Sequence, residues 1–395
     1  MRIKQIYNQV LNKINTEHIK CINNMDKPLF LISTAYPGVW LEHVYDSIMY
    51  AKLFDDKSIA VTTINAFIDL QLEDGQYPYS IKASNTVGYF QIQECVSFTK
   101  LAYMVYEMVE DDNLLLKIYE SSKKWVSWLY NNRMTLNKGL VEMFVGYDTG
   151  HDNSARLDGM KYKGNYEIDG VKQNASVLPD CDNAPIIAVD MNCNLYATLT
   201  TIAKIAKKLN RLDEENKYLQ MAKELKANLF KECYDSEDVF FYDVDKNGNK
   251  RKYLSSTIFH LFLEGVLDKN DDKELIDKLY NLHINNKNEF NTPYPFPAMA
   301  ISDKEWETHK MRNSWGYYSQ ALIALRCSLW MDEYGYSNDY NNLLSKWVEG
   351  LVNNFDYNPM SQELDPITGE ASLASPWYST SMLLFIYAIR RLKLI

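Results

Sequence analysis

The sequence predicts an all-α protein built as an (α/α)₆ barrel, and two observations lead to this prediction. Apolar residues recur at helical spacing through most of the 395 residues, while the alternation typical of strands is scarce. The predicted helices are joined alternately by very short turns and by long loops. If outer and inner helices alternate in a closed ring, every long loop emerges on one rim, at the N-terminal ends of the inner helices.

Twelve helical segments follow one another in a single predicted domain over residues 1–395. They span residues 3–25, 41–55, 57–72, 91–111, 113–131, 186–209, 213–232, 254–266, 271–283, 316–334, 338–356 and 376–393. The long loops span residues 26–40, 73–90, 132–185, 233–253, 284–315 and 357–375. Loops longer than about 12–15 residues are uncommon unless they are functional. A solenoid would need a repeated signature and similar loop lengths; neither is present, which favours the closed barrel.

One β hairpin is predicted. The segments 239–243 and 250–254 flank the turn signal Asn247-Gly248. The stretch from Asp243 to Gly248 also resembles the first half of a calcium-binding loop. Its twelfth position is Leu254, where a bidentate Glu is required, so we expect no calcium there.

Composition argues against several partners. The net charge is −10 and the 42 Lys and Arg residues are scattered, which argues against a nucleic-acid partner. No run approaches 18 consecutive apolar residues, so no membrane span is expected, and the N-terminal pattern is not that of a secretory signal. The six cysteines are widely spaced without a CxxC pair, as in a protein with reduced thiols and no zinc site. We therefore expect a cytoplasmic protein; oligomeric state has no signature in the sequence.

Carboxylates and tryptophans are concentrated in the long loops. Asp152 lies in loop 132–185 and Glu363 in loop 357–375, and in a six-pair ring these two loops face each other across the barrel mouth. Inverting cleavage of a glycosidic bond needs an acid and a base about 6.5–9.5 Å apart, so this pair could span the scissile bond. Trp40, Trp315 and Trp377 lie near the starts of inner helices, where they either stack on a sugar ring or fill the core.

Other catalytic arrangements lack support. A nucleophilic Ser154 would need a G-x-S-x-G elbow, and none is present. His151 has no second histidine at ligand spacing, so we expect no metal. Glycine-rich phosphate loops are also missing. An epimerase with this architecture would need paired histidines facing the cavity, and the six histidines offer no obvious pair.

Several motifs, in the same order along the chain, carry a family resemblance. They are Trp40–Ser47, which ends in Asp46-Ser47; Gln71 to Pro78; Gly150-His151-Asp152-Asn153-Ser154-Ala155-Arg156; Val189-Asp190-Met191-Asn192; Arg312–Trp315; and Asp365-Pro366-Ile367-Thr368-Gly369. At these residues the sequence resembles the inverting (α/α)₆ glycosidases of glycoside hydrolase family 63 and mannosylglycerate hydrolase, and more distantly trehalase.

The resemblance implies roles for individual residues. Asp152 matches the aspartate that serves as general acid in the family. The substrate-binding side chains that we assign are Trp40, Asp46, Gln91, Arg156, Asn192, Arg312, Trp315 and Trp377. The resemblance implies no metal and no organic cofactor.

The chain departs from the family pattern at one important position. The general base of the family is a Glu three residues before the Asp of the Asp-Pro-x-Thr-Gly motif, and here that position is Gln362, followed by Glu363. A neutral Gln cannot take a proton from water. Three interpretations follow: the loop is shifted by one residue so that Glu363 serves, Gln362 is an engineered replacement of Glu, or hydrolysis by this route does not occur.

The leading prediction is a glycoside hydrolase that cleaves a small α-glucoside or α-mannoside, or a glycosyl-glycerate, with inversion at the anomeric carbon. Asp152 would be the acid, and Glu363 or the position of Gln362 would hold the attacking water. The alternative is a non-hydrolytic (α/α)₆ protein, either a sugar-binding regulatory barrel or a glycosyl phosphorylase, because Gln362 is neutral.

Overall fold

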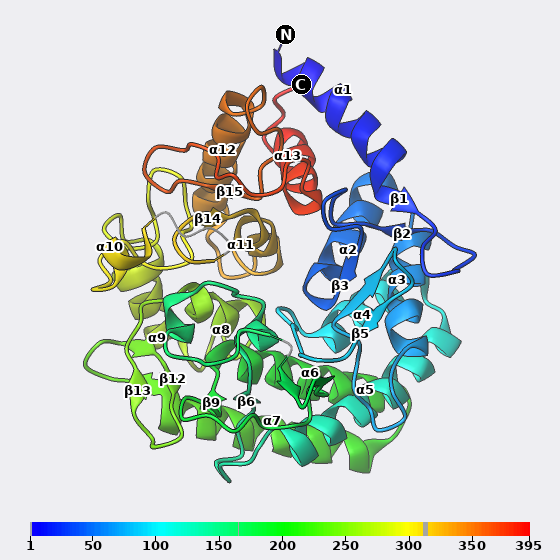
Figure 1. Cartoon of the computed structure of the whole chain (residues 1–395), viewed down its shortest axis with the longest axis vertical. Helices are drawn as coiled ribbons and strands as arrows, with labels where there is room; N and C mark the ends of the chain where they lie inside the picture. Colours follow the sequence, from blue (N-terminus) through cyan, green and yellow to red (C-terminus); the bar gives the residue numbers. More distant parts are fainter. Residues whose placement is uncertain (1, 165, 311–314) are drawn as a thin grey trace.

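The computed structural model describes residues 2–164, 166–310 and 315–395, and these residues form an (α/α)₆ barrel (Figure 1). The inner helices are α2 (Val44–Phe54), α4 (Phe98–Val109), α6 (Val189–Lys208), α8 (Phe259–Leu263), α11 (Ala321–Arg326) and α13 (Ser379–Arg391). The outer helices are α1 (Arg2–Lys13), α3 (Ser58–Asp69), α5 (Asp112–Asn132), α7 (Leu212–Cys233), α9 (Lys273–Leu279) and α12 (Ser337–Asn353). Helix α13 packs against both α1 and α2, which closes the ring where the two chain ends meet.

The burial pattern explains which helices lie inside. Helix α2 buries eight consecutive residues, 44–51, as expected for a helix surrounded by other elements. Helix α7 instead buries a single stripe at spacings of three and four residues: Tyr218, Ala222, Leu225, Leu229 and Cys233. A narrow stripe of this kind suits an outer helix, because its opposite face remains in water. No helix in the described part of the chain has the length and apolar character needed to cross a membrane.

Each of the twelve predicted helices has a counterpart, but several boundaries differ. The short helix α10 (Trp306–His309) was not predicted and lies within loop 284–315. The segment predicted as 3–25 is helical only as far as His18, because α1 continues into one π turn and then into a strand. The segment predicted from residue 91 begins at Phe98, where the Ser97 side chain caps α4.

The prediction of a single β element was wrong, although the predicted hairpin is present. Strands β12 and β13 pair Asp243 with Arg251. The strands of the described residues are β1 (Ile19–Lys20), β2 (Leu29–Phe30), β3 (Gly38–Trp40), β4 (Ser80–Lys82), β5 (Val87–Gly88), β6 (Glu142–Met143), β7 (Glu167–Ile168), β8 (Val171–Lys172), β9 (Ile186–Ile187), β10 (Tyr234–Asp235), β11 (Phe240–Phe241), β12 (Asp243–Val244), β13 (Lys250–Arg251), β14 (Ser319–Gln320) and β15 (Glu363–Leu364). Strands of two or three residues are too short to leave a period-two pattern in the sequence.

These strands connect the long loops into small sheets on the rim. The sheets are β3-β4-β5, β13-β12-β9-β6, β14-β15, β1-β2, β10-β11 and β7-β8. Short helical turns join the strands to the inner helices, including η2 (Leu41–His43), η3 (Gly146–Thr149), η4 (Ala155–Leu157) and η5 (Ser256–Ile258). The rim loops are thus held by backbone hydrogen bonds, which fixes the side chains that they carry.

Candidate active site

A pocket of about 150 Å³ opens among the rim loops. Its lining residues are Ile32, Tyr36, Trp40, Glu42, His43, Gln93, Asp152, Gln362 and Tyr378. They come from the four connections that precede the inner helices α2, α4, α6 and α13, so the pocket depends on the closed ring. It brings together two carboxyl groups, two amides and several aromatic rings.

Asp152 supplies one of the two carboxyl groups. Its Oδ1 atom is buried and has no hydrogen-bond partner among the residues that the structure describes. Burial raises the pKa of Asp152 to about 7; the nearby Glu363 contributes to this rise, and Lys163 partly opposes it. A carboxyl group that keeps its proton near neutral pH and has an unoccupied oxygen can act as a general acid.

Buried polar contacts hold the loop that carries Asp152. Asp148, four residues earlier, pairs with Arg133 at 2.6 Å, and both side chains are fully buried. The same carboxylate accepts hydrogen bonds from the backbone N–H groups of Ile92, Phe144 and Val145. The loop backbone next to the pocket is therefore fixed at several points.

Gly150 allows this loop to approach the opposite wall of the pocket. Its φ is +71°, and a Cβ atom there would lie 2.4 Å from Sγ of Cys95 and 2.6 Å from Oε2 of Glu42. We expect Gly150→Ala to displace Asp152 and to reduce both the free energy of unfolding and any activity of this pocket. The alanine would be strained by the left-handed backbone, and its Cβ atom would also clash with Cys95 and Glu42. Thermal unfolding and activity measurements test this.

Gly170→Ala is the matched control, because Gly170 has a similar φ of +76° and no atom of the described residues lies within 4 Å of its Cβ position. The free energy of unfolding of this variant should fall by only about 1–2 kcal/mol, the usual cost of a left-handed backbone for a residue with a Cβ atom. Equal losses for the two variants would contradict the close approach of the loop to Glu42.

Gln362 lines the pocket, whereas Glu363 is not among the lining residues. Glu363 is fully buried and accepts hydrogen bonds from Nε2 of Gln320 at 2.7 Å and from Oγ of Ser372 at 2.8 Å. Successive side chains of an extended segment point to opposite faces. Gln362 therefore faces the pocket, whereas Glu363, the next residue, faces the protein interior. The structure therefore places the amide, and not the neighbouring carboxyl, at the position that the resemblance assigns to the base.

Glu42 supplies the second carboxyl group of the pocket, and sequence reasoning did not select it. It lies in η2, directly after β3 and Trp40. Burial raises its pKa to about 8, and the charge of Asp152 adds to the rise. A signal was present in the sequence, because Glu42 lies inside the Trp40–Ser47 stretch of the resemblance, but no local pattern distinguished it from a surface carboxylate.

Of the predicted binding residues, Trp40 lines the pocket and three others have internal partners. Asp46 accepts hydrogen bonds from the hydroxyl groups at the start of α13, Ser379 at 2.5 Å and Thr380 at 2.8 Å. Gln91 is buried and donates to the side-chain oxygen of Gln93, a lining residue. Asn192 bonds to the backbone of Val141 and Ala188.

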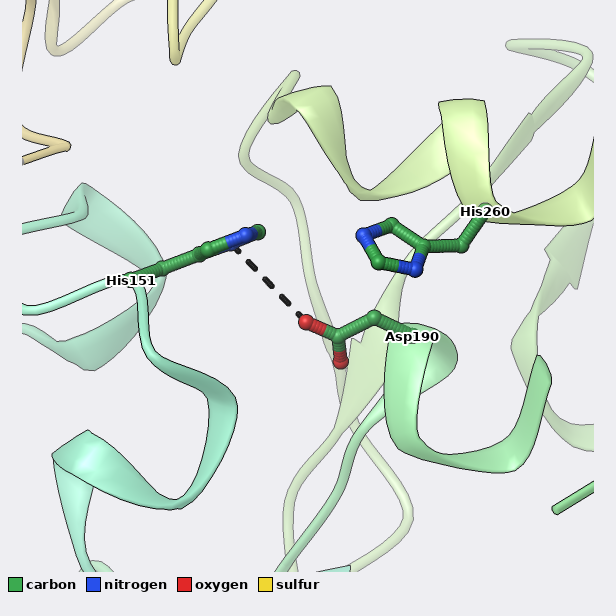
Figure 2. A group of neighbouring side chains, drawn as sticks. All are labelled: His151, Asp190 and His260. Atoms are coloured by element: carbon green, nitrogen blue, oxygen red, sulfur yellow. Dashed lines mark ion pairs between the residues drawn. The ribbon is translucent and has the colours of Figure 1, made fainter. Parts of the chain in front are cut away.

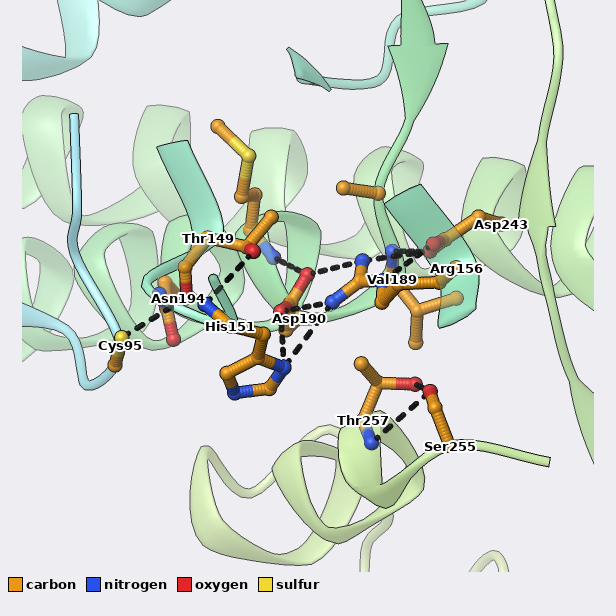
Figure 3. Close-up of polar contacts among 12 residues, drawn as sticks. Cys95, Thr149, His151, Arg156, Val189, Asp190, Asn194, Asp243, Ser255 and Thr257 are labelled. Atoms are coloured by element: carbon orange, nitrogen blue, oxygen red, sulfur yellow. Dashed lines mark hydrogen bonds and ion pairs between the residues drawn. The ribbon is translucent and has the colours of Figure 1, made fainter. Parts of the chain in front are cut away.

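Arg156 lies in a buried cluster with two aspartates (Figure 3). Its Nη1 and Nη2 atoms donate to Asp190 at 2.5 and 2.9 Å, and its Nε and Nη2 atoms donate to Asp243 at 2.6 and 2.8 Å. Burial opposes ionisation of Asp190, but the guanidinium outweighs it and holds the pKa of that carboxyl well below its usual range. The hydrogen bonds of Arg156 therefore link η4, α6 and β12.

The other two predicted tryptophans, Trp315 and Trp377, are not among the residues that line the pocket. Trp315 is 3% exposed and stacks on His151 with a ring separation of 4.1 Å. Trp377 contacts Phe355 edge to face and lies under the Lys13 ammonium. Arg312, the other predicted binding residue, lies outside the described residues.

The sequence offers no obvious histidine pair, but the structure places His260 next to His151. His260, on α8, brings its ring centroid within 6.0 Å of that of His151, and Asp190 completes a buried trio whose ligand atoms lie within 4.8 Å of one another (Figure 2). The two histidines come from segments far apart in the chain, so sequence spacing could not reveal the pair.

The donor types of this trio match a two-histidine, one-carboxylate metal site. However, Asp190 is already paired with Arg156, whose charge would repel a cation placed next to it. Burial also lowers the pKa of both histidines, to about 4 for His260. Neither histidine lines the pocket. We therefore assign the trio a packing role beneath the rim.

Comparison with known proteins agrees with this architecture. The model of the mannosylglycerate hydrolase MGH1-like glycoside hydrolase domain matches residues 36–381. Among solved structures, the mannosylglycerate hydrolase of Thermus thermophilus, in complex with Tris and D-glycerate, is 14% identical with a TM-score of 0.71, covering 98% of this chain and 99% of that chain. Neutral trehalase Nth1 of Saccharomyces cerevisiae is 15% identical with a TM-score of 0.70, covering 97% and 79%.

A third similar structure is a rhamnosidase from Klebsiella oxytoca with rhamnose bound, 14% identical with a TM-score of 0.58, covering 99% of this chain and 64% of that chain. These low identities establish the fold alone. No curated protein matches the sequence. The family model, which covers most of the chain, identifies a glycosidase: the chain belongs to the mannosylglycerate hydrolase MGH1-like glycoside hydrolase family.

Proposed function

We propose that this glycosidase hydrolyses a small α-glucoside or α-mannoside with inversion at the anomeric carbon, with Asp152 as the general acid. The observation that carries the proposal is the position of Asp152, whose buried Oδ1 atom has no partner among the described residues, in a pocket lined by aromatic and amide side chains. Its match to the acid position of the family supports the same role.

The size of the pocket favours a small substrate. Its volume of about 150 Å³ is below the ~300–1,000 Å³ typical of sites for drug-sized ligands, so we propose that it encloses one sugar unit. Trp40 is half-buried at its wall and presents a ring on which a sugar can stack.

The aglycone that we propose is short and includes acidic groups such as glycerate. Two cations lie beside the pocket residues: Nζ of Lys82 is 5.7 Å from the ring centroid of Trp40, and Lys163 is close enough to lower the pKa of Asp152. Both suit a carboxylate next to the sugar. The D-glycerate bound to the Thermus thermophilus enzyme supports this class of substrate.

The second candidate is a glycosyl phosphorylase, which Gln362 favours because its amide cannot activate water. Phosphate would then replace water as the nucleophile, and the product would be a sugar 1-phosphate. Hydrolysis is the leading proposal because the pocket contains a second carboxyl in addition to Asp152.

The test is an assay of sugar release from α-linked disaccharides, glucosylglycerate and mannosylglycerate, each with and without inorganic phosphate. We expect release without phosphate from one of the small α-glycosides and little from starch or other polymers. Strict dependence on phosphate would establish the phosphorylase instead. Binding without turnover of any member would contradict both.

We also propose that residues 1–395 act as one catalytic domain in the cytoplasm. A continuous hydrophobic core runs from Ile6 to Ile389. All six cysteines are unpaired, as in proteins of reducing compartments.

A further inference from the structure

The pocket needs a proton acceptor for the attacking water, and Gln362 cannot serve. We propose that Glu42 is the second catalytic carboxyl of this site and takes that proton. This inference rests on the proposed hydrolysis, because only hydrolysis needs a base for water. It assigns the task to a different loop from the one that carries Gln362 and Glu363.

The position of Glu42 is the first argument. Its side chain lines the same pocket as Asp152 and Gln362. Gly150, two residues before Asp152, would touch Oε2 of Glu42 if it carried a Cβ atom, so the acid loop lies directly against this carboxyl. Arg326, on inner helix α11, donates a hydrogen bond to the backbone carbonyl of Glu42 at 2.8 Å and so fixes the residue in place.

The surroundings of Glu42 are the second argument, because a polar atom lies close to each of its two carboxyl oxygens. Sγ of Cys95 lies 3.6 Å from Oε2, and Nδ1 of His43 lies 3.3 Å from Oε1. Arg326, Cys95 and Gln93 each lower the pKa of Glu42, against the larger effect of burial. Tyr378, another ionisable side chain of the pocket wall, stays neutral because burial raises its pKa.

Asp152 differs in this respect, because its buried Oδ1 has no hydrogen-bond donor within the described part of the chain. The charge of Asp152 raises the pKa of Glu42, so the pair favours a state in which only one of the two carboxyl groups is ionised. One protonated and one ionised carboxyl is the state that an acid and base pair requires.

The reaction step balances with these two groups alone. Asp152 gives its proton to the glycosidic oxygen while the C1–O bond breaks and its electron pair stays on that oxygen. Water forms the new bond to C1 from the opposite face, and the proton that it loses goes to the Glu42 carboxylate. The products are the inverted sugar and the free alcohol, and a proton then passes from Glu42 to Asp152 through solvent.

The test compares Glu42→Gln, Asp152→Asn and Gln362→Glu with the wild type. The substrates are the best α-glycoside of the panel and the corresponding α-glycosyl fluoride. Fluoride leaves without a proton, so it bypasses the acid but still needs an activated water. We expect Glu42→Gln to lose about 10²–10⁴-fold in kcat on both substrates, and Asp152→Asn to lose activity on the glycoside only.

Two further measurements separate catalysis from structure. Azide should restore turnover of the fluoride to Glu42→Ala and yield a glycosyl azide, because an anionic nucleophile needs no base; a structural defect would not respond. Glu142→Gln is the matched control for loss of a buried carboxylate, since Glu142 bonds to Thr135 and to the backbone of Leu136 away from the pocket. The kcat of Glu142→Gln should stay within a few-fold of the wild-type value on both substrates.

The results distinguish failure of the role proposed for Glu42 from failure of the proposed hydrolysis. If the wild type releases an inverted sugar but Glu42→Gln keeps its activity, or Gln362→Glu raises kcat more than tenfold, the role of Glu42 is wrong and the proposed hydrolysis stands. If neither the wild type nor Gln362→Glu hydrolyses any member of the panel, both proposals fall.

Discussion

Replacing Asp152 by Asn is expected to reduce hydrolysis of an unactivated α-glycoside by about 10²–10⁴-fold, the usual contribution of a general acid. The amide has nearly the same shape as the carboxyl group but no proton to give to the leaving oxygen. Since no described residue forms a hydrogen bond with Oδ1 of Asp152, the substitution breaks no bond to them at that atom. Steady-state kinetics on the best substrate of the panel measure the loss.

The same variant should be more stable than the wild type at pH 8. The pKa of Asp152 is about 7 in the folded protein and about 3.9 when a chain is unfolded. The folded state therefore binds more protons between these values, and its stability falls as the pH rises through that range. A neutral Asn removes this cost, so a higher melting temperature at pH 8 than that of the wild type is the expected result.

Asp69→Asn is the control, because Asp69 is an exposed residue at the end of α3, 3.7 Å from Lys117. It should change neither activity nor stability appreciably. Full activity in Asp152→Asn on an unactivated glycoside would contradict the acid role.

The largest effect on stability is expected for Arg156→Leu, at about 3–5 kcal/mol. The substitution leaves the carboxylates of Asp190 and Asp243 buried without their shared cation, and each is only slightly exposed. Removing one partner of a buried ion pair is more costly than removing the whole pair, because the remaining charge has no water to solvate it. Urea unfolding of the variant and the wild type measures the difference.

Two further variants test this explanation. Arg211→Leu removes a half-exposed arginine that pairs with Glu120, and it should cost about 1 kcal/mol or less. Adding Asp190→Asn and Asp243→Asn to Arg156→Leu should recover part of the lost stability, because the buried charges disappear. A loss in Arg156→Leu no larger than that in Arg211→Leu would contradict the buried network.

The ring itself could be predicted from loop lengths, whereas the rim sheets could not. Alternating long and short connections are a property of the whole chain, so errors of several residues at helix ends did not affect the prediction. The rim strands are two or three residues long, and their pairing partners are distant in sequence; β9 joins β6 and β12, for example. Nothing local marks such pairs.

The candidate site was predicted in part, for a related reason. Asp152, Trp40 and Gln362 belong to motifs in the loops, and the structure places all three at the pocket. Arg156 belongs to the same motif as Asp152, yet its donors are occupied by two aspartates from other segments. Motif membership identifies the loop, but the direction of each side chain depends on packing between segments, which the sequence does not display.

The most direct test of the central claim is ¹H NMR of the first sugar that the wild-type protein releases from an α-linked substrate. Attack by water opposite to Asp152 predicts that the β-anomer appears first and that the α-anomer follows only by mutarotation. Release of the α-anomer first, or formation of a sugar 1-phosphate in place of free sugar, would contradict the account.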